Sequence, residues 1–368
     1  MKTGNITLLI GPSFAGKTTE LIRQINRHKV MQKKICLILP EEKHKEQSKF
    51  NFLKGQIIHT SLLCDVLRNS IFEDADIIAI DDLHYFLDVL YVVPLMADKF
   101  NKKIICAGLD NNSERELYGN VVELIPKCEY VEKLTAFCSD TCDTSPAIFT
   151  KKINGKFQAV SRKAYLNVSE TGFLHIITGP MFSGKTTELI RMAKQYQSIN
   201  KRILAINYSR DTRYDNEANI FSHDKQKFES TLPLETLDGL LNNPKINEND
   251  VILIDEVQFF KNSFDIIKSL VEEHKKIVIV SGLDGDYLQN PFGDICRLIA
   301  FADKLTRLNA ICCLSSDYPD ASFSRRIAKS METEFIGSED SYMAVSRVIY
   351  NLPYDEFIGK LMKEKSLE

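Results

Sequence analysis

Two stretches of this 368-residue chain have the residue types and spacing of a phosphate-binding loop. Residues 11–23 read GPSFAGKTTELIR and residues 179–191 read GPMFSGKTTELIR, so eleven of thirteen positions are identical at an offset of 168. In such a loop the glycines let the backbone curl until its amides point at a phosphate, and the lysine reaches the phosphate oxygens. A repeated match of this length indicates that the chain consists of two copies of one unit.

The second copy of the loop is a candidate site for a nucleotide with Mg²⁺. A short apolar run precedes it and a helical pattern follows it, which is the context that a phosphate-binding loop requires. We expect Lys185 on the β and γ phosphates and Thr186 on Mg²⁺. The loop residues assigned to nucleotide binding are Gly179, Pro180, Met181, Phe182, Ser183, Gly184, Lys185, Thr186 and Thr187. The corresponding candidate site in the first copy has Gly11, Gly16, Lys17 and Thr18.

Each copy also has a four-residue apolar run that ends in two acidic residues. Val251–Ile254 leads to Asp255 and Glu256, and Ile77–Ile80 leads to two aspartates. A carboxylate at the end of such a strand holds the magnesium shell of a nucleotide, so we assign Asp255 to Mg²⁺. Glu256 is placed to act as a general base on an attacking hydroxyl. The same dipeptide also occurs in ATPases, where the glutamate activates water, so it cannot by itself separate a kinase from an ATPase.

A polar segment follows the expected strand at residues 202–207 of the second copy. It contains Asp211, Thr212 and Arg213, with a further arginine before them. Arg213 is a candidate for stabilising charge on a transferred phosphoryl group, and Asp211 is a candidate for holding a magnesium-bound water. The alternative is an ion pair within a turn.

Strand patterns alternate with helical patterns in both copies, which predicts two parallel-sheet α/β domains. Ligands of such sheets bind at the carboxyl ends of the strands, where the loop and the acidic pair both lie. We expect domains at residues 1–168 and 171–353. A small β lobe should close each domain, and residues 354–368 should form a surface helix or a frayed tail. Strands are expected at residues 6–10, 34–39, 56–59, 77–80, 103–107, 174–178, 202–207, 251–254 and 276–282, and helices at 19–29, 188–199 and 295–302.

Composition narrows the class of protein. A formal charge of −3 offers no basic surplus for nucleic acid, and no apolar run approaches the length of a membrane span. Nine cysteines without a secretory signal predict reduced thiols and a cytoplasmic location. Cys138 and Cys142 lack a second pair downstream, so we interpret them as thiols rather than metal ligands.

The motifs of the second copy, in their order and spacing, resemble those of type II thymidine kinases, the family of the human cytosolic and poxviral enzymes. The resemblance covers nearly all of residues 171–353, and the tandem arrangement is similar to fused protozoan members. It rests on GPMFSGKTTELIR, on DTRY at 211–214, on DEVQFF at 255–260, on LDG at 283–285, on PFG at 291–293 and on the IG…D…Y pattern at 336–342.

The resemblance implies a RecA-like fold and transfer of phosphate from ATP with Mg²⁺ to thymidine, and to deoxyuridine. Glu256 would activate the 5′-hydroxyl, with Lys185 and Arg213 as the other catalytic residues. The remaining nucleotide-binding positions are Asp211, Thr212, Asp255, Val257 and Gln258. Tyr287 stands where the family usually has a phenylalanine that stacks on the base. Thymine-pocket positions are Met181, Phe259, Leu283, Tyr287, Phe292 and Ser324, and positions of the lasso loop over the nucleoside are Thr333, Glu334, Phe335, Ile336, Gly337 and Tyr342.

The sequence also departs from the family pattern. Family members commonly hold the lobe with a zinc ion bound by two C-x-x-C pairs, of which Cys312 alone is kept here, so we predict no structural zinc and a lobe held by packing. In the first copy the base position is Asp82, the stacking ring is lost and the lasso motif is missing, so we expect it to be inactive. The family further implies feedback inhibition by dTTP and a homodimer that imitates a tetramer. The alternatives are a P-loop ATPase and a nucleotide-binding regulatory protein.

Overall fold

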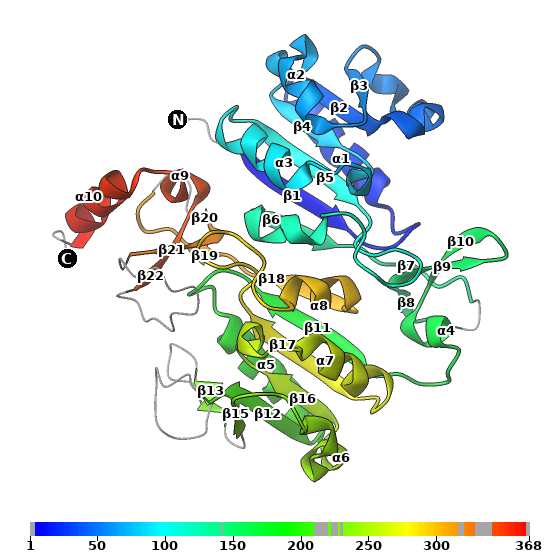
Figure 1. The fold of residues 1–368 in the computed structure, drawn as a ribbon, viewed down its shortest axis with the longest axis vertical. Coiled ribbons are helices and arrows are strands. Elements are labelled where there is room, and N and C mark those ends of the chain that lie inside the picture. The colour runs from blue at the N-terminus through cyan, green and yellow to red at the C-terminus, as the bar shows by residue number, and fades with distance from the viewer. Residues whose placement is uncertain are drawn as a thin grey trace. The chain divides into compact units, whose positions relative to one another are not determined.

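The computed structural model describes residues 4–140, 143–209, 220–221, 227–228, 231–315, 320–327 and 341–365. The chain divides into two compact units, Met1–Val168 and Ser169–Glu368, and each is described by itself. Both are built around a six-stranded sheet that carries a small β lobe after its last strand (Figure 1).

The sheet of the first unit has the order β3-β2-β4-β5-β1-β6, and all its neighbouring strands are parallel. The central strands are continuous aliphatic runs because helices and loops cover both faces of the sheet. The strands are β1 (Asn5–Ile10), β2 (Ile35–Pro40), β3 (Ile57–Thr60), β4 (Ile77–Ile80), β5 (Lys103–Gly108) and β6 (Tyr130–Lys133).

The sheet of the second unit repeats this topology as β15-β12-β16-β17-β11-β18, again with parallel neighbours. The equal order places the same motifs at the same sheet edge in both units. The strands are β11 (Phe173–Thr178), β12 (Ile203–Tyr208), β15 (Thr231–Leu234), β16 (Val251–Ile254), β17 (Ile277–Gly282) and β18 (Lys304–Arg307). A further pair outside this sheet is β13 (Ile220–Phe221) with β14 (Lys227–Phe228).

Helices connect the strands of each sheet. In the first unit they are α1 (Lys17–Val30), η1 (Glu41–Leu53), η2 (Leu63–Arg68), α2 (Ser70–Asp74), η3 (Leu83–Tyr85), α3 (Val89–Asp98), η4 (Val122–Lys127) and α4 (Arg162–Leu166), where η marks a 3-10 helix. In the second unit they are α5 (Lys185–Ser198), η5 (Leu240–Asn242), α6 (Pro244–Glu248), η6 (Val257–Phe259), α7 (Ser263–Glu272), α8 (Ile295–Phe301), α9 (Arg347–Tyr350) and α10 (Tyr354–Lys365).

The lobes differ between the units. The first consists of β7 (Ala136–Phe137) with β8 (Pro146–Ala147) and of β9 (Phe149–Ile153) with β10 (Lys156–Val160). Asn154 and Gly155 join β9 to β10 with φ angles of 49° and 77°, the left-handed conformations of a tight two-residue hairpin turn. The second lobe consists of β19 (Ala310–Ile311) with β20 (Asp320–Ala321) and of β21 (Phe323–Arg326) with β22 (Tyr342–Val345).

Strands β6 and β18 and the C-terminal segment differ from the sequence-based expectations. The edge strands β6 and β18 were not predicted, because their polar sequences lack a buried run. The segment after residue 353, expected as a surface helix or a frayed tail, forms α10 with Phe357 fully buried and Leu361 6% exposed. It is therefore part of the second lobe rather than a tail.

Candidate active site

The phosphate-binding loop of the second unit connects β11 to α5. Gly179 and Gly184 have φ angles of 147° and 81°, and a side chain on Gly179 would come within 2.2 Å of the Leu308 carbonyl oxygen. Glycine is therefore required there by both conformation and space. Lys185 begins α5, and its Nζ donates to the Pro180 carbonyl at 2.7 Å. The loop thus sets a lysine and a helix N-terminus side by side, as a phosphate site requires.

Asp255 follows β16 and faces the first turn of α5. Its Oδ2 accepts a hydrogen bond from Thr186 Oγ1 at 3.1 Å, and its Oδ1 accepts one from Ser281 Oγ. Burial raises the pKa of Asp255 to about 6, and the neighbouring Glu256 adds to this shift. A carboxylate and a hydroxyl are the hard oxygen donors that Mg²⁺ prefers, so this pair fits the metal of a bound nucleotide.

Glu256, the candidate base, sits in the left-handed conformation with φ of 53°. Gln258 Nε2 donates to Glu256 Oε2 at 2.6 Å, while Gln258 Oε1 accepts from the backbone N–H of Leu283 at 3.1 Å. Because Oε1 must face an N–H, Nε2 must face the carboxylate, so the amide has one satisfactory orientation. Gln258 is 4% exposed. It joins the base to the residue expected at the pocket wall.

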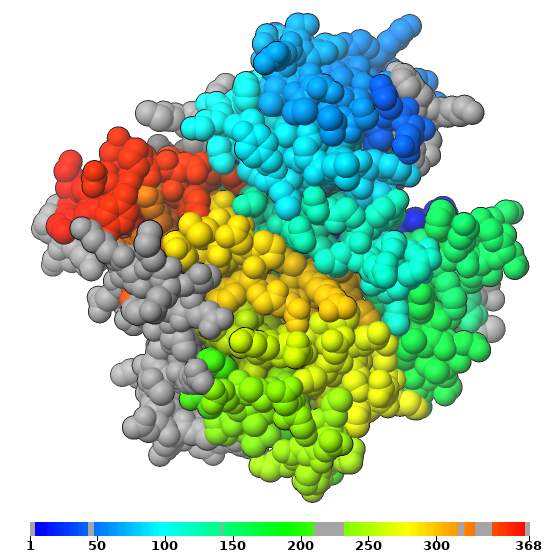
Figure 2. All heavy atoms as spheres, in the orientation of Figure 1, coloured from blue at the N-terminus to red at the C-terminus, as the bar shows by residue number. Residues whose placement is uncertain are grey.

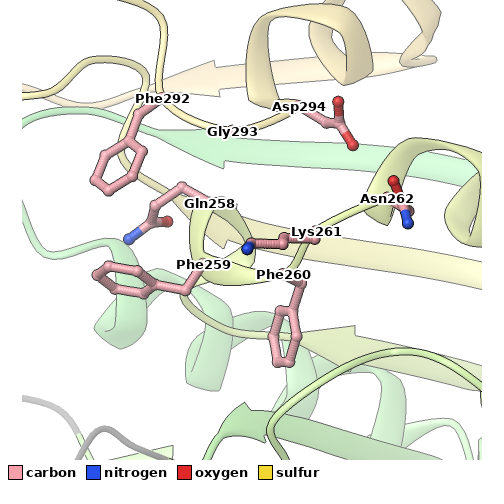
Figure 3. A pocket seen from close by; sticks show the side chains of 8 residues that line it. All are labelled: Gln258, Phe259, Phe260, Lys261, Asn262, Phe292, Gly293 and Asp294. Atoms are coloured by element: carbon pink, nitrogen blue, oxygen red, sulfur yellow. The ribbon is translucent and has the colours of Figure 1, made fainter. Parts of the chain in front are cut away.

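Aromatic rings line a hollow beside this group. Phe259 and Phe292 meet edge to face with centroids 5.5 Å apart, and Tyr208 stacks on Phe259 at 5.2 Å. Figure 3 shows both phenylalanine rings next to the amide of Gln258. The pocket has a volume of about 480 Å³ and is lined by Gln258, Phe259, Phe260, Lys261, Asn262, Phe292, Gly293 and Asp294.

The lobe reaches this region through two alternate residues of β21. Ser324 Oγ accepts the backbone N–H of Met181, in the phosphate loop, at 2.9 Å. The Arg326 guanidinium lies 3.8 Å from the ring centroid of Tyr287 and donates through Nε to Tyr342 Oη at 3.2 Å. These contacts connect the predicted stacking ring, the phosphate loop and one of the predicted lasso residues.

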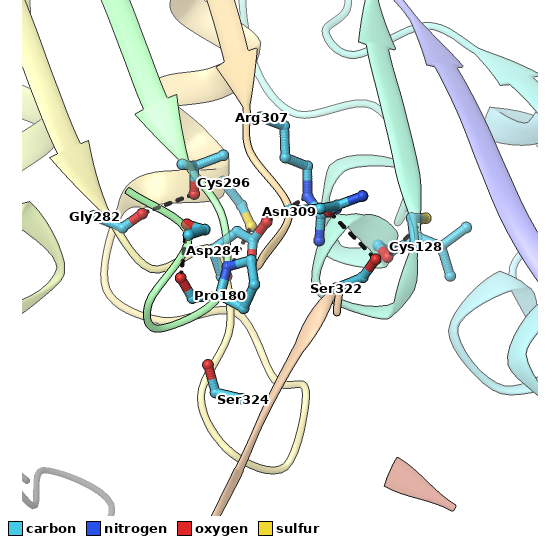
Figure 4. A network of polar contacts seen from close by, with 12 residues as sticks. Cys128, Pro180, Gly282, Asp284, Cys296, Arg307, Asn309, Ser322 and Ser324 are labelled. Carbon is cyan, nitrogen blue, oxygen red and sulfur yellow. Dashed lines mark hydrogen bonds and ion pairs between the residues drawn. The ribbon is translucent and has the colours of Figure 1, made fainter. Parts of the chain in front are cut away.

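A polar network joins Asp284, three residues before Tyr287, to Arg307, Asn309 and Ser322 (Figure 4). Arg307 Nε and Asp284 Oδ2 form a buried ion pair at 2.6 Å. Arg307 Nη1 also donates to Asn309 Oδ1 at 3.4 Å, and the same oxygen accepts from Ser322 Oγ at 3.3 Å. Ser322 lies two residues before Ser324, so the network links the loop that carries Tyr287 to the lobe.

Several predicted site residues lie outside the described residues. They are Asp211, Thr212, Arg213, Thr333, Glu334, Phe335, Ile336 and Gly337, and their roles stay predictions.

Comparison with known proteins decides the family. The family model described as thymidine kinase matches residues 4–166 and, a second time, residues 172–350. The chain belongs to the thymidine kinase family. The two matches fall one in each unit, which confirms the tandem duplication.

Single-copy relatives agree with this arrangement. Thymidine kinase of Myxoma virus (strain Uriarra) is 42% identical over 180 residues, which are 49% of this chain and 96% of the viral protein. Thymidine kinase 1 of Dictyostelium discoideum is 39% identical over 188 residues, which are 50% of this chain and 80% of that protein. Thymidine kinase of Vaccinia virus (strain Western Reserve) is 38% identical over 179 residues, which are 49% of this chain and 97% of the relative.

The first unit of this thymidine kinase family member keeps the phosphate-site contacts. Lys17 Nζ donates to the Pro12 carbonyl at 2.6 Å, and Thr18 Oγ1 donates to Asp81 Oδ2 at 2.9 Å. Burial raises the pKa of Asp81 to about 6, with Asp82 as the second cause, as at Asp255. Residues that a nucleotide needs are thus arranged alike in both units.

The surroundings of the base position differ in the first unit. Asp82 has the same left-handed conformation as Glu256, with φ of 51°. His84 takes the place of Gln258: its Nδ1 accepts from the Leu109 N–H at 3.3 Å, and its Nε2 is 4.0 Å from Asp82 Oδ1. The imidazole thus reaches the acid less closely than the glutamine amide does.

The positions of the first unit that correspond to the expected nucleoside pocket differ further from those of the second unit. Ser113 stands in place of Tyr287. Two residues connect β9 to β10, whereas fifteen residues, 327–341, lie between β21 and β22. The Arg115 guanidinium lies over the rings of Tyr165 at 4.6 Å and Phe149 at 5.3 Å. In the first unit, Arg115 of the loop that corresponds to the Tyr287 loop therefore packs against the lobe.

Within the described part of the chain, no group of three or more His, Cys, Asp or Glu side chains is placed to hold a metal ion. Cys142 and Ser316 lie outside that part, so the expected lack of a structural zinc stays a prediction. No helix among the described residues is both long and apolar enough to cross a membrane.

Proposed function

We propose that the second unit transfers the γ-phosphoryl group of ATP to the 5′-hydroxyl of thymidine, and of deoxyuridine, in nucleotide salvage. One observation carries this assignment: Glu256 stands beside the Thr186–Asp255 pair, and Gln258 ties it to Leu283 at the expected thymine wall. A base fixed to the nucleoside pocket is placed for an organic hydroxyl.

The residues divide the work by position. The loop amides and Lys185 hold the phosphates, and Arg213 is proposed to contact the transferred group. When bound through Thr186 and Asp255, Mg²⁺ neutralises charge on the phosphates. Glu256 takes the proton of the 5′-hydroxyl, while Gln258 Nε2 holds its Oε2 in place. Met181, Phe259, Leu283, Tyr287, Phe292 and Ser324 position the nucleoside, and residues 333–337 with Tyr342 close over it.

We further propose that the first unit does not phosphorylate thymidine. Phosphoryl transfer depends on positioning, and this unit has a shorter acid at the base position, no ring at position 113 and a tight turn in its lobe. Its loop supports nucleotide binding alone. Binding of ATP by the full chain with Lys185→Ala would measure that site separately from the one in the second unit.

Three proteins test the assignment: wild type, Glu256→Gln and Asp82→Asn. We expect wild type and Asp82→Asn to phosphorylate thymidine and Glu256→Gln to lose about 10²- to 10⁴-fold in kcat. If Asp82→Asn is inactive while folded, the first unit takes part in the chemistry or controls it, and our division of labour is wrong.

A P-loop ATPase is the second candidate function, because an Asp-Glu pair also occurs in that class. ADP release separates the two: a thymidine kinase releases ADP in proportion to thymidine, and an ATPase releases it without thymidine. The link from Glu256 through Gln258 to Leu283, an expected thymine-pocket residue, favours the kinase.

Three finer proposals follow from the family. dTTP is expected to inhibit by filling the nucleoside site, which competition with thymidine would reveal. A dimer of this chain is expected to imitate a tetramer of single units, and a solution mass of one chain would contradict it. We place the reaction in the cytoplasm, where nine cysteines are expected to stay reduced.

A further inference from the structure

Strand β21 has two faces with different tasks. Ser324 and Arg326 point to the candidate active site, where they contact the Met181 amide and the Tyr287 ring. Since side chains alternate along a strand, Phe323 and Arg325 point the other way. Both belong to contacts with the C-terminal segment, so this strand lies between the site and the end of the described chain.

Helix α10 packs against that second face. Phe357 is fully buried and Leu361 is 6% exposed, one turn apart on the same side of the helix. Figure 2 shows the C-terminal segment bordering the residues of the lobe, and Figure 1 shows α10 following α9 beside β21. The buried members of this apolar cluster are Ala310, Cys312, Ala321, Phe323, Ala344, Val345, Ile349 and Phe357.

Arg325 fixes the strand to the segment between α9 and α10. Its guanidinium lies 4.1 Å from the ring centroid of Phe357. The same group donates to the carbonyl of Ile349 and, through Nη2, to that of Leu352 at 2.7 Å. Arg325 therefore satisfies carbonyls at the end of α9 while it covers the ring of α10.

The start of α10 also holds the residue that follows β21. Tyr354 Oη donates to the carbonyl of Ile327 at 2.8 Å. Tyr350, the last residue of α9, donates to the carbonyl of Tyr287 at 2.8 Å. Two tyrosines of the C-terminal segment thus fix backbone positions on both sides of the Arg326–Tyr287 stack.

We propose that α10 is a positioning element for the nucleoside site: by clamping β21 from behind, it sets Arg326 and so the stacking ring Tyr287. This inference rests on the proposed function. It concerns nucleoside binding rather than the phosphates, because Arg326 of β21 faces the Tyr287 ring. The contact of Ser324 with the phosphate loop has a counterpart in the first unit, where Thr150 accepts the Ser13 N–H at 2.8 Å, so it does not depend on α10. Phe357, Arg325 and Tyr354 are therefore positioning residues rather than catalytic ones.

The first unit has no room for such a clamp. Six residues, 167–172, separate α4 from β11, whereas α10 alone has twelve. There the strand that corresponds to β21 is β9, and Lys151 of β9 donates to the carbonyl of Tyr165 at 2.7 Å. Tyr165 Oη also donates to the Ser113 carbonyl at 2.8 Å, which is the counterpart of the Tyr350 contact. The contacts that distinguish the unit to which we assign the reaction are therefore those of α10 with Arg325 and with Ile327.

The test compares Phe357→Ala with Met362→Ala in the full chain. Met362 lies on the same helix and is 68% exposed, so its variant controls for a change in helix composition. We expect Phe357→Ala to raise the KM for thymidine by about tenfold and to leave the KM for ATP within about twofold of wild type. Phe357→Leu, which refills most of the space, should recover most of the affinity.

Equal loss of kcat with both KM values unchanged would mean that the variant merely unfolds, and it would overturn the inference. Because Phe357→Ala could fail to fold, Tyr354→Phe is a second variant that removes one hydroxyl. It should raise the KM for thymidine by about two- to threefold at unchanged thermal stability, and no change in that KM would contradict the clamp.

Hydrogen exchange provides a readout that does not depend on the substrate. The amides of β21 and β22 should exchange faster in Phe357→Ala than in Met362→Ala, while those of β11 and β17 should not change. A wild type that does not phosphorylate thymidine would refute the proposed function alone. Unchanged exchange in β21 would refute the clamp alone.

Discussion

Asp82 and Glu256 occupy the same left-handed position after β4 and β16, yet the groups around them differ. Both follow a buried aspartate bonded to a threonine of the phosphate loop. Gln258 Nε2 lies 2.6 Å from Glu256 Oε2, whereas His84 Nε2 lies 4.0 Å from Asp82 Oδ1. The phosphate site is encoded by one continuous motif with one distant aspartate, so it persists in both units. The expected nucleoside site needs residues from several separate segments, and the two units differ at most of these positions.

The largest effect is expected from exchanging the acids. Glu256→Asp gives the second unit the residue of the first and withdraws the carboxylate from the hydroxyl by one methylene. We expect kcat for thymidine to fall by about 10²- to 10³-fold. Steady-state phosphorylation of thymidine measures this fall in kcat. The reciprocal variant Asp82→Glu is the control, and its kcat should stay at the wild-type value. A Glu256→Asp enzyme close to wild type would show that the acid does not distinguish the units.

The lobe of the first unit provides the next prediction. Asp143, almost buried, accepts from Ser161 Oγ and pairs with Lys163 Nζ at 2.8 Å. These partners hold the pKa of Asp143 well below its usual range against the opposing effect of burial. Asp143→Asn should lower the stability of the first unit by about 2 kcal/mol, because a charge-assisted hydrogen bond is lost.

Thymidine kcat should stay within about twofold in the same variant, since the second unit does not use this network. Asp74→Asn is the control, because Asp74 pairs with Lys34 on the surface and such pairs contribute little. Denaturant unfolding measures the stability of both variants, Asp143→Asn and Asp74→Asn. An equal effect of the two substitutions would contradict a structural role of Asp143.

A third prediction exchanges the residues behind the acids. Gln258→His places the first unit's residue next to Glu256 and lengthens the bond that orients the carboxylate. We expect kcat to fall by about tenfold with little change in the KM for ATP. The reverse variant His84→Gln should leave kcat unchanged. Loss of ATP affinity instead would indicate that Gln258 contacts the nucleotide, as the sequence led us to expect.

The smallest effect concerns acid stability. His175 and Thr7 occupy the same register, opposite Ile279 and Ile105 in their sheets. Burial, with the charge of Lys304, lowers the pKa of His175 to about 4. The neutral ring is favoured in the folded state, so its contribution is complete above the unfolded pKa of about 6.5 and is lost as pH falls toward 4.

At pH 5 the charging of His175 should therefore cost the second unit about 2 kcal/mol relative to pH 7.5, and His175→Thr should remove this cost. The raised pKa of Asp255 favours the folded second unit as pH falls and offsets about 1 kcal/mol of this cost, so the net loss in wild type is about 1 kcal/mol. Asp255 is the same in wild type and variant, so its effect cancels when the two proteins are compared. Equal pH dependence of wild type and variant would contradict a neutral buried His175.

The sequence predicts the parts of this molecule that are local. Continuous aliphatic runs such as Ile77–Ile80 predict buried parallel strands, and the loop motif predicts the phosphate contacts. It does not predict β21, whose four residues FSRR show no apolar alternation, or the pairing of Arg307 with Asp284, which are 23 positions apart. Such contacts depend on tertiary structure rather than on periodicity.

Two signals were present but overlooked. Phe357 and Leu361 have the i, i+4 spacing of a buried helix stripe, which argues against a frayed tail. Asn154-Gly155 between two short strand-like segments is a strong hairpin signal, and it would have predicted the closed turn of the first lobe.

Because α10 follows the second unit, the order of the two units along the chain matters for the structure. A duplication that joins one copy to the next through six residues leaves no length for a twelve-residue helix after the leading copy. In the described structure the second unit has such a helix after its lobe and the first unit has none, so the two lobes are supported differently. A chain with the units in reverse order would therefore need a connection longer than six residues to keep α10 in place.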